Sequence, residues 1–319
     1  MVDPKENSYL FKPVPFMGQP TVIPPLSEGK IATAVQFIVL GLRLKDTEKK
    51  KIFRMAQLCE KGLYGVDTKH IENNKTKEKA TLFTFAFYVN NKIVGKEKND
   101  TIYSLSRLLV ERFLCIFLFI AGVKLRAVNL QPTVVNENGS YSQILHMANR
   151  TEVPKIMINI PDEIDSINIS NEVFSALFWL RRGLAERDPI ENFSSLMVCL
   201  QIIARYLSTK QPTKHYCPSC GAELESLDRS ITAMMRELVV TKLNASPGLF
   251  EKLWKARNAI TSHGNRPVTP EVFIELTELK FDAINLAFNS IKLSLGLPLD
   301  FPISPNQMYF VADAFMYVD

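Results

Sequence analysis

The stretch SNEVFSALFWLRRGLAERDPIENFSSLMVCLQIIARYL, from Ser170 to Leu207, predicts two amphipathic helices separated by a short break. Ser170 has a side chain suited to the N-cap of the first helix, and an acidic residue follows in the first turn. After the break, Asp188 can cap the second helix, which opens with Pro189 at its first position. The apolar stripe of that second helix consists of Phe193, Leu196, Leu200 and Ile203. Two helices with so short a connection are typical of neighbours in an α-helical bundle.

Helical patterns continue towards the C-terminus of the chain. Residues 230–243 and 248–263 predict a third and a fourth helix, and Thr269 with Pro270 opens a fifth. Residues 170–297 therefore predict an all-α bundle of five helices, interrupted by a cysteine-containing loop at 215–221. Residues 298–319 are expected to form a C-terminal tail.

The first half of the sequence has a different pattern. Residues 1–30 are rich in proline and predict an extended arm, and residues 31–165 predict a mixed α/β domain. Ala80–Gly95 predicts a β-hairpin with alternate phenylalanines on one face, followed by a helix over 101–122 and a strand near 155–161. The apolar run at 27–46 fits either a helix or a strand, and the polar run Val66–Lys79 predicts a solvated loop. The fold class expected for the whole chain is α+β.

Bulk properties narrow the class of protein. With 319 residues, 46% hydrophobic and 22% charged, the composition is that of a globular protein with one large or two smaller domains. The net charge of +5 permits a polyanionic partner but does not require one. The N-terminus shows no secretory signal, and the longest apolar run, from Phe113, is much shorter than the roughly 20 residues that span a bilayer. Five cysteines, an odd number, do not suggest a disulfide framework, so we expect a soluble cytoplasmic protein without a membrane partner.

The stretch KARNAITSHGNRPVTPEV, which begins at Lys255, is the strongest candidate for chemistry. It contains Arg257, Asn258 and His263, with Gly264 directly after the histidine. A purely structural interpretation is available, because a glycine can end a helix and a histidine in the last turn interacts well with the helix dipole. An arginine at this distance from a histidine is also a weak signal by itself.

The context favours a functional interpretation. The arginine, its polar neighbour and the histidine resemble the signature of the HEPN superfamily (higher eukaryotes and prokaryotes nucleotide-binding). The upstream helix, Asp-Pro break and helix, and the Cys-x-x-Cys-Gly loop, are similar to its ApeA-like branch. This resemblance covers residues 170–297. It implies a HEPN helical bundle and a metal-independent endoribonuclease with Arg257, His263 and Asn258 as catalytic residues.

The implied site is composite, built by two copies of the chain. RNA brings its own nucleophile, the 2′-hydroxyl, so the protein must move protons and stabilise charge on the phosphorane. A histidine with a pKa of about 6.5 suits the first task, and a forked, permanently charged arginine suits the second. Six residues on a helix leave Arg257 and His263 about 120° apart, so Arg257 must reach around the helix or His263 must lie beyond the last regular turn, which Gly264 favours. A symmetric dimer eases the problem further, because each site can borrow a residue from the facing chain.

The resemblance further implies an RNA substrate, a homodimer or higher homo-oligomer, and a toxin or antiviral defence role with an antitoxin or sensor partner. A non-catalytic HEPN module that binds RNA or nucleotide, or that scaffolds a complex, is the alternative. A third interpretation makes the N-terminal half a sensor that restrains the bundle.

Several upstream residues are further candidates. One of the carboxylates Glu186, Asp188 and Glu191 could pair with the arginine of the signature, although Asp188 is better explained as a helix cap. Arg181 and Arg182 could contact phosphate, although a solvated basic face is the simpler explanation.

Cys217 and Cys220 have the spacing with which two thiolates chelate zinc, and Gly221 would ease the turn. This is half of a zinc ribbon, since no second Cys-x-x-Cys is present and His215 is too near to be an easy third ligand. Two interpretations are therefore open. In the first, Cys217 and Cys220 bind a structural zinc ion, which two copies of the chain could share. In the second, the segment is an exposed loop without metal. No cofactor is expected for catalysis, and Cys199, on an apolar helix stripe, is expected in the core.

Overall fold

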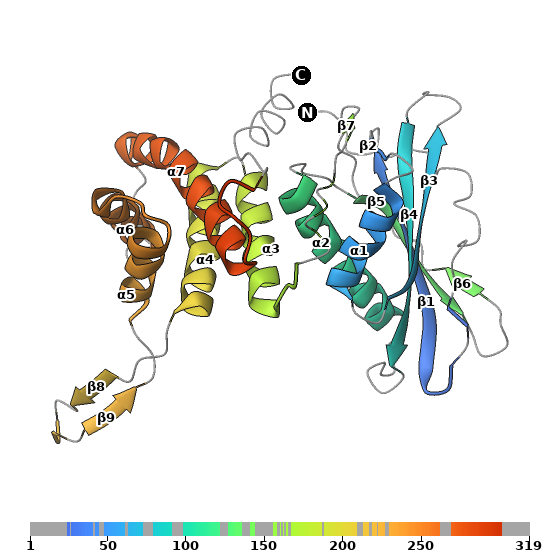
Figure 1. Cartoon of the computed structure of the whole chain (residues 1–319), viewed down its shortest axis with the longest axis horizontal. Helices are drawn as coiled ribbons and strands as arrows, with labels where there is room; N and C mark the ends of the chain where they lie inside the picture. Colours follow the sequence, from blue (N-terminus) through green and yellow to red (C-terminus); the bar gives the residue numbers. More distant parts are fainter. Residues whose placement is uncertain are drawn as a thin grey trace. The chain divides into compact units, whose positions relative to one another are not determined.

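The computed structural model divides the chain into two compact units. The N-terminal unit comprises Met1–Phe117 and Leu125–Ser166, and the C-terminal unit comprises Leu118–Lys124 and Ile167–Asp319. The fold is a mixed α+β fold (Figure 1). The structure describes residues 24–25, 27–40, 42–44, 48–60, 63–72, 79–90, 98–121, 127–135, 141–143, 156–157, 160, 162, 164, 167–186, 188–208, 213–216, 219–221, 223–226, 230–261 and 269–301.

A five-stranded antiparallel sheet with the order β3-β4-β1-β5-β6 organises the N-terminal unit. Its strands are β3 (Leu63–Glu72), β4 (Lys79–Asn90), β1 (Lys30–Leu40), β5 (Ala127–Val135) and β6 (Tyr141–Gln143). A separate parallel pair joins β2 (Leu42–Arg43) to β7 (Ile156–Met157). The ambiguous run at 27–46 is therefore mainly a strand, because it lies between β4 and β5 and is paired on both sides.

Phenylalanines form the core of this unit. Phe37 and Phe83 are opposite each other in the β1–β4 register and stack with their ring centroids 5.0 Å apart. Phe113 of α2 (Lys98–Ala121) meets Phe85 edge-on at 4.9 Å. All four rings are fully buried. Helix α1 (Lys49–Cys59) and α2 lie over the same face of the sheet (Figure 1), so the apolar helix expected at 101–122 is confirmed as a core helix.

The prediction of a solvated loop at Val66–Lys79 is wrong over much of its length, because β3 runs to Glu72 and β4 begins at Lys79. β3 is an edge strand, a position where charged side chains are common since one side meets no further strand. The Nε2 of His70 in β3 lies 3.0 Å from the carbonyl oxygen of Leu44. Pairing with β4 thus outweighs the polarity of the segment. The second strand of the predicted hairpin falls at 91–95, outside the described residues.

The C-terminal unit is built from the helices that the sequence predicts. They are α3 (Asn171–Ala185), α4 (Pro189–Leu207), α5 (Ile231–Arg236), the π-helix η4 (Glu237–Lys242), α6 (Pro247–Thr261) and α7 (Pro270–Ser294). Helix α4 is central, because it contacts α3, α5, η4, α6 and α7. Its buried face includes the predicted stripe Phe193, Leu196, Leu200 and Ile203.

Two local features differ from the sequence-based expectation. The single helix expected at 230–243 turns into a π-helix in its second half and is followed by Asn244 with a positive φ of 54°. A short hairpin, β8 (Thr213–Tyr216) with β9 (Glu223–Ser226), flanks the cysteine segment that was expected to be a plain loop. Within the described part of the chain, no helix has both the length and the apolar character needed to cross a bilayer. The expected arm at 1–30 and the expected tail at 298–319 fall largely outside the described residues.

Candidate functional site

Helix α6 positions the arginine and asparagine of the candidate signature. Ser246 accepts a hydrogen bond from the backbone N–H of Leu249 at 3.1 Å, and Pro247 occupies the start of the helix, as is common at helix N-termini. The buried face of α6 consists of Phe250, Leu253 and Ala256. Because these residues recur every three positions, the flanking side of the helix carries Trp254, Arg257 and Asn258 in half-buried positions.

The guanidinium of Arg257 lies between an aromatic ring and an amide. Its central carbon is 5.1 Å from the ring centroid of Trp254, one helical turn earlier, and its Nη1 donates a hydrogen bond to Oδ1 of Asn258 at 3.0 Å. Stacking on an aromatic face and a planar, forked donor set are the properties that distinguish arginine from lysine at sites that bind phosphate. The asparagine therefore holds one edge of a cation that can donate several hydrogen bonds.

A second cation–aromatic pair lies one turn away. Phe250 stacks on Trp254 with ring centroids 6.0 Å apart, and the guanidinium carbon of Arg236 lies 5.1 Å from the Phe250 ring. Arg236 also forms an ion pair with Glu251, and both side chains are exposed. Two arginines thus flank a pair of stacked rings, and one of them, Arg236, is paired with a carboxylate on α6.

The structure brings together two of the three predicted catalytic residues. Arg257 and Asn258 are hydrogen-bonded neighbours near the end of α6. His263 and Gly264 fall in the segment 262–268, outside the described residues, so the arginine–histidine pair stays a prediction.

The cysteine segment is described only in part. Cys220 is exposed in the turn between β8 and β9, and Gly221 has a positive φ of 69°, a conformation that favours glycine. Cys217 lies outside the described residues. No group of three or more histidine, cysteine or carboxylate side chains that could hold a metal occurs within the described ranges. Zinc binding by Cys217 and Cys220 stays a prediction.

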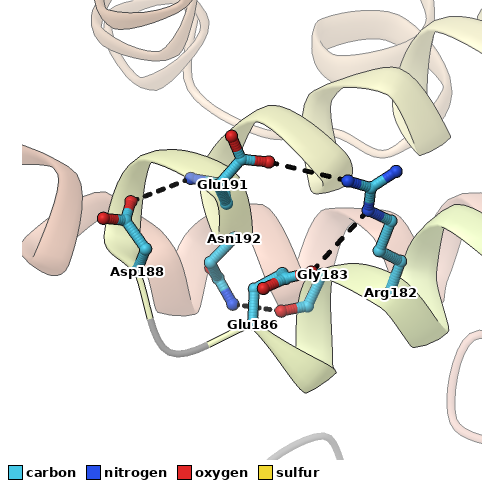
Figure 2. Close-up of polar contacts among 6 residues, drawn as sticks. All are labelled: Arg182, Gly183, Glu186, Asp188, Glu191 and Asn192. Carbon is cyan, nitrogen blue, oxygen red and sulfur yellow. Dashed lines mark hydrogen bonds and ion pairs between the residues drawn. The ribbon is translucent and has the colours of Figure 1, made fainter.

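The junction of α3 and α4 contains the other candidate carboxylates, and Figure 2 shows them. Asp188 accepts hydrogen bonds from the backbone N–H groups of Ile190 at 2.8 Å and Glu191 at 3.2 Å, which confirms it as the N-cap of α4. The side chains of Glu186 and Glu191 lie 3.7 and 3.8 Å from nitrogens of Arg182. These two carboxylates therefore neutralise an arginine of their own junction.

Sequence reasoning missed a buried polar residue at this junction. Asn192 is almost completely buried, and its Nδ2 donates a hydrogen bond to the carbonyl oxygen of Gly183, at the C-terminal end of α3 (Figure 2). Gly183 allows the two helices to approach closely, because a Cβ at that position would lie 3.1 Å from Cγ of Leu196. The only available signal was a glycine in the last turn of one helix and an amide in the first turns of the next.

Two titratable groups in this unit have a clear structural cause for their shifts. Cys199 is fully buried, which confirms it as a core residue, and this burial raises the pKa of its thiol. The hydrogen bond from Thr269 lowers the pKa of the Glu271 carboxyl in the first turn of α7. Thr269 is the N-cap of that helix, as predicted. Neither residue has a direct role in the proposed chemistry. Cys199 shows that α4 is packed in the core, and Thr269 shows that α7 begins with an ordinary side-chain cap.

We compared the chain with family models, with curated proteins and with solved structures, and none of the three comparisons returned a match.

Proposed function

We propose that the chain is a metal-independent endoribonuclease of HEPN type. Its active site would contain Arg257, Asn258 and His263 and would be completed by a second copy of the chain. The observation that carries this proposal is the arrangement of Arg257, which is stacked on Trp254 and hydrogen-bonded to Asn258 in a half-buried position. The guanidinium carbon of Arg182 also lies 5.1 Å from a tryptophan ring, so the hydrogen bond to the neutral amide of Asn258, rather than the ring contact, is the feature that supports the proposal.

In the proposed reaction the 2′-oxygen of a ribose attacks the adjacent phosphorus, and the bond from phosphorus to the 5′-oxygen of the next nucleotide breaks. The products are a 2′,3′-cyclic phosphate and a free 5′-hydroxyl. One proton leaves the 2′-hydroxyl and one must reach the departing 5′-oxygen. Imidazole performs such transfers near neutral pH, and two copies of the chain would supply two histidines.

Arg257 would stabilise the negative charge that develops on the phosphorane oxygens, since charge-assisted and bidentate hydrogen bonds are the strongest that a protein offers to phosphate. Asn258 would act as a positioning residue, because its amide oxygen holds one nitrogen of that guanidinium. By analogy with the family, the biological role would be that of a toxin or antiviral defence effector acting on cellular RNA, restrained by an antitoxin or sensor.

The test is incubation of the purified full chain with total RNA in the presence of excess EDTA, followed by analysis of the new RNA ends. We expect cleavage that resists the chelator and leaves 2′,3′-cyclic phosphates. Cleavage that disappears with EDTA, or that leaves 3′-hydroxyl ends, would contradict the proposed chemistry. An inert wild-type protein that still binds RNA would favour the non-catalytic module.

A further inference from the structure

A second arginine lies beside the aromatic stack that carries Arg257. The rings of Phe250 and Trp254 are nearly parallel, with an interplanar angle of 16° and their centroids 6.0 Å apart. The guanidinium carbon of Arg257 lies 5.1 Å from the centroid of the Trp254 ring, and that of Arg236 lies 5.1 Å from the centroid of the Phe250 ring. The two cations therefore belong to one continuous group of side chains.

Each of these arginines also contacts a side-chain oxygen of α6. Asn258 accepts a hydrogen bond from Arg257 at 3.0 Å, and Glu251 forms an ion pair with Arg236. Glu251 and Asn258 are seven residues apart, which places them only about 20° apart around the helix axis. Helix α6 thus holds both arginines with a ring and an oxygen, but Glu251 carries a negative charge and Asn258 does not.

A ring and a carboxylate do not mark a binding site by themselves, because Arg182 on α3 has both. Its guanidinium carbon lies 5.1 Å from the ring centroid of Trp179, and its nitrogens pair with Glu186 and Glu191. Arg236 differs from Arg182 in its position, since the ring that it contacts is stacked on a ring of the candidate site. The argument for Arg236 therefore depends on its place beside the candidate site.

The spacing of the two arginines suits a nucleic acid strand. Phe250, which Arg236 contacts, and Arg257 are seven residues apart, or about 10 Å along the axis of α6. One strand of a double helix carries a phosphate about every 3.4 Å of its axis. Two arginines at this spacing can therefore bind different phosphates of the same strand.

The ion pair between Arg236 and Glu251 is open to solvent. The two side chains are 53% and 57% exposed. Water screens the attraction in such a pair, and both long side chains lose freedom when they form it, so the pair is held weakly. A phosphate offers a guanidinium the same charge-assisted hydrogen bonds as a carboxylate. Once a strand is bound at Arg257, its neighbouring phosphates are present at high effective concentration and can replace the carboxylate.

The backbone changes its pitch directly after Arg236. This arginine is the last residue of α5, and the π-helix η4 follows at Glu237–Lys242. Turns of π-helix are rare and are frequent at functional sites. Because η4 contacts α6, the altered turn lies next to the helix that carries the aromatic stack.

We propose that Arg236 is a second phosphate-binding residue of the candidate site and that Glu251 restrains it. The strand whose reacting phosphate lies at Arg257 displaces the carboxylate of Glu251 and places a neighbouring, non-reacting phosphate at Arg236. Arg236 then contributes to the binding of the substrate and not to the chemical step. The inference deepens the proposed function and rests on it for the identity of the ligand, a single strand of RNA.

The first test is binding to an RNA oligonucleotide with a 2′-O-methyl group on every ribose, which lacks the nucleophile and stays intact. Fluorescence anisotropy measures Kd over a range of NaCl concentrations. We expect Arg236→Gln to raise Kd about 5- to 10-fold and to lower the slope of log Kd against log [NaCl] by about one. The matched control is Arg182→Gln, which removes an arginine that also has a ring and carboxylates beside it, and its Kd should stay within about twofold of the wild type. Thermal unfolding verifies that both variants are folded.

Substitution of the carboxylate tests the restraint. We expect Glu251→Gln to lower Kd by about 3- to 10-fold, because the amide leaves the charge of Arg236 available to phosphate. This gain should be lost in the double variant Arg236→Gln/Glu251→Gln. A gain that persists without Arg236 would show that Glu251 acts by general repulsion, and it would overturn the inference.

Three further results would also overturn it. The first is a wild type that does not bind the methylated strand. The second is an Arg236→Gln variant with unchanged Kd and salt slope. The third is a Glu251→Gln variant that binds as poorly as Arg236→Gln, because the ion pair would then act only by supporting the fold.

Cleavage kinetics with ordinary RNA separate this inference from the proposed function. We expect Arg236→Gln to raise KM by the same factor as Kd and to leave kcat within about twofold of the wild type. Cleavage to cyclic phosphate ends with a KM that does not depend on Arg236 keeps the nuclease and removes the second phosphate contact. A wild type that leaves RNA intact but binds the methylated strand through Arg236 keeps the contact and removes the nuclease.

Discussion

Helices α3 and α4 meet at Asp188–Pro189, and helix α7 follows α6 through Thr269–Pro270. Both junctions use the same local chemistry, a side-chain cap followed by a proline at the first helical position. They differ in what surrounds the arginine on the preceding helix. Both arginines lie over a tryptophan of their own helix, with the guanidinium carbon 5.1 Å from the ring centroid of Trp179 for Arg182 and of Trp254 for Arg257. Arg182 also pairs with Glu186 and Glu191, whereas Arg257 donates a hydrogen bond to the amide oxygen of Asn258.

The comparison shows that a cap and a proline specify where a helix starts and say little about function. Two carboxylates beside an arginine partly offset its positive charge, so it attracts a phosphate less strongly. A neutral amide such as that of Asn258 orients a guanidinium without placing a negative charge beside it. Packing and ion pairing account for the residues of the α3–α4 junction, whereas the end of α6 carries Arg257 and Asn258 of the proposed site.

The largest effect that we expect from substitutions at the two junctions is on the rate of RNA cleavage. His263→Ala and Arg257→Ala should each lower the cleavage rate by roughly 10²- to 10⁴-fold, because they remove proton transfer and charge stabilisation. Arg182→Ala is the matched control at the other junction, and its rate should stay within about twofold of the wild type. Equal losses in Arg182→Ala and Arg257→Ala would show that both arginines act only by binding RNA or by supporting the fold.

The second largest effect is on the free energy of unfolding, and it tests the close approach of α3 and α4 at Gly183. Gly183→Ala introduces a Cβ that would lie 3.1 Å from Cγ of Leu196 and 3.3 Å from the backbone oxygen of Asn192. We expect the free energy of unfolding to fall by about 1–3 kcal/mol in a urea titration, despite the better helix propensity of alanine. Gly248→Ala in α6 is the control, because its Cβ would meet nothing within 4 Å. That variant should be neutral or slightly more stable, and a loss as large as that of Gly183→Ala would contradict the packing argument.

The smallest effect compares the two caps directly. Asp188→Ala removes an acceptor that lies 2.8 Å from a backbone N–H, whereas Thr269→Ala removes one at 3.5 Å. Losing an N-cap costs about 1 kcal/mol, so Asp188→Ala should lower the free energy of unfolding by about that amount and Thr269→Ala by less. Urea titration of both variants measures the difference. A larger loss for Thr269→Ala would mean that the start of α7 contributes more than its cap.

Much of the C-terminal unit was predictable because its signals are local. Ser170, Asp188 and Thr269 all cap the helices that the sequence assigned to them. Strand β3 was not predictable in this way, since its polar residues follow no apolar alternation and only pairing with β4 makes them a strand. The polar residues of the C-terminal unit also differ in whether a local signal identifies them. Arg257 and Asn258 could be selected from a short motif, whereas Asn192 could be found only once α3 and α4 were packed together.

The sequence by itself determined where helices begin and break, which face of α4 is apolar, and which residues of α6 are candidates for phosphate chemistry. These features depend on neighbours within one or two helical turns. The tertiary structure alone decided that Glu191 of α4 pairs with Arg182 of α3, and that Asn192 of α4 donates a hydrogen bond to the carbonyl oxygen of Gly183 in α3. The physical reason is that burial and charge pairing depend on which other surfaces come close in space, and a linear pattern of residues does not contain that information.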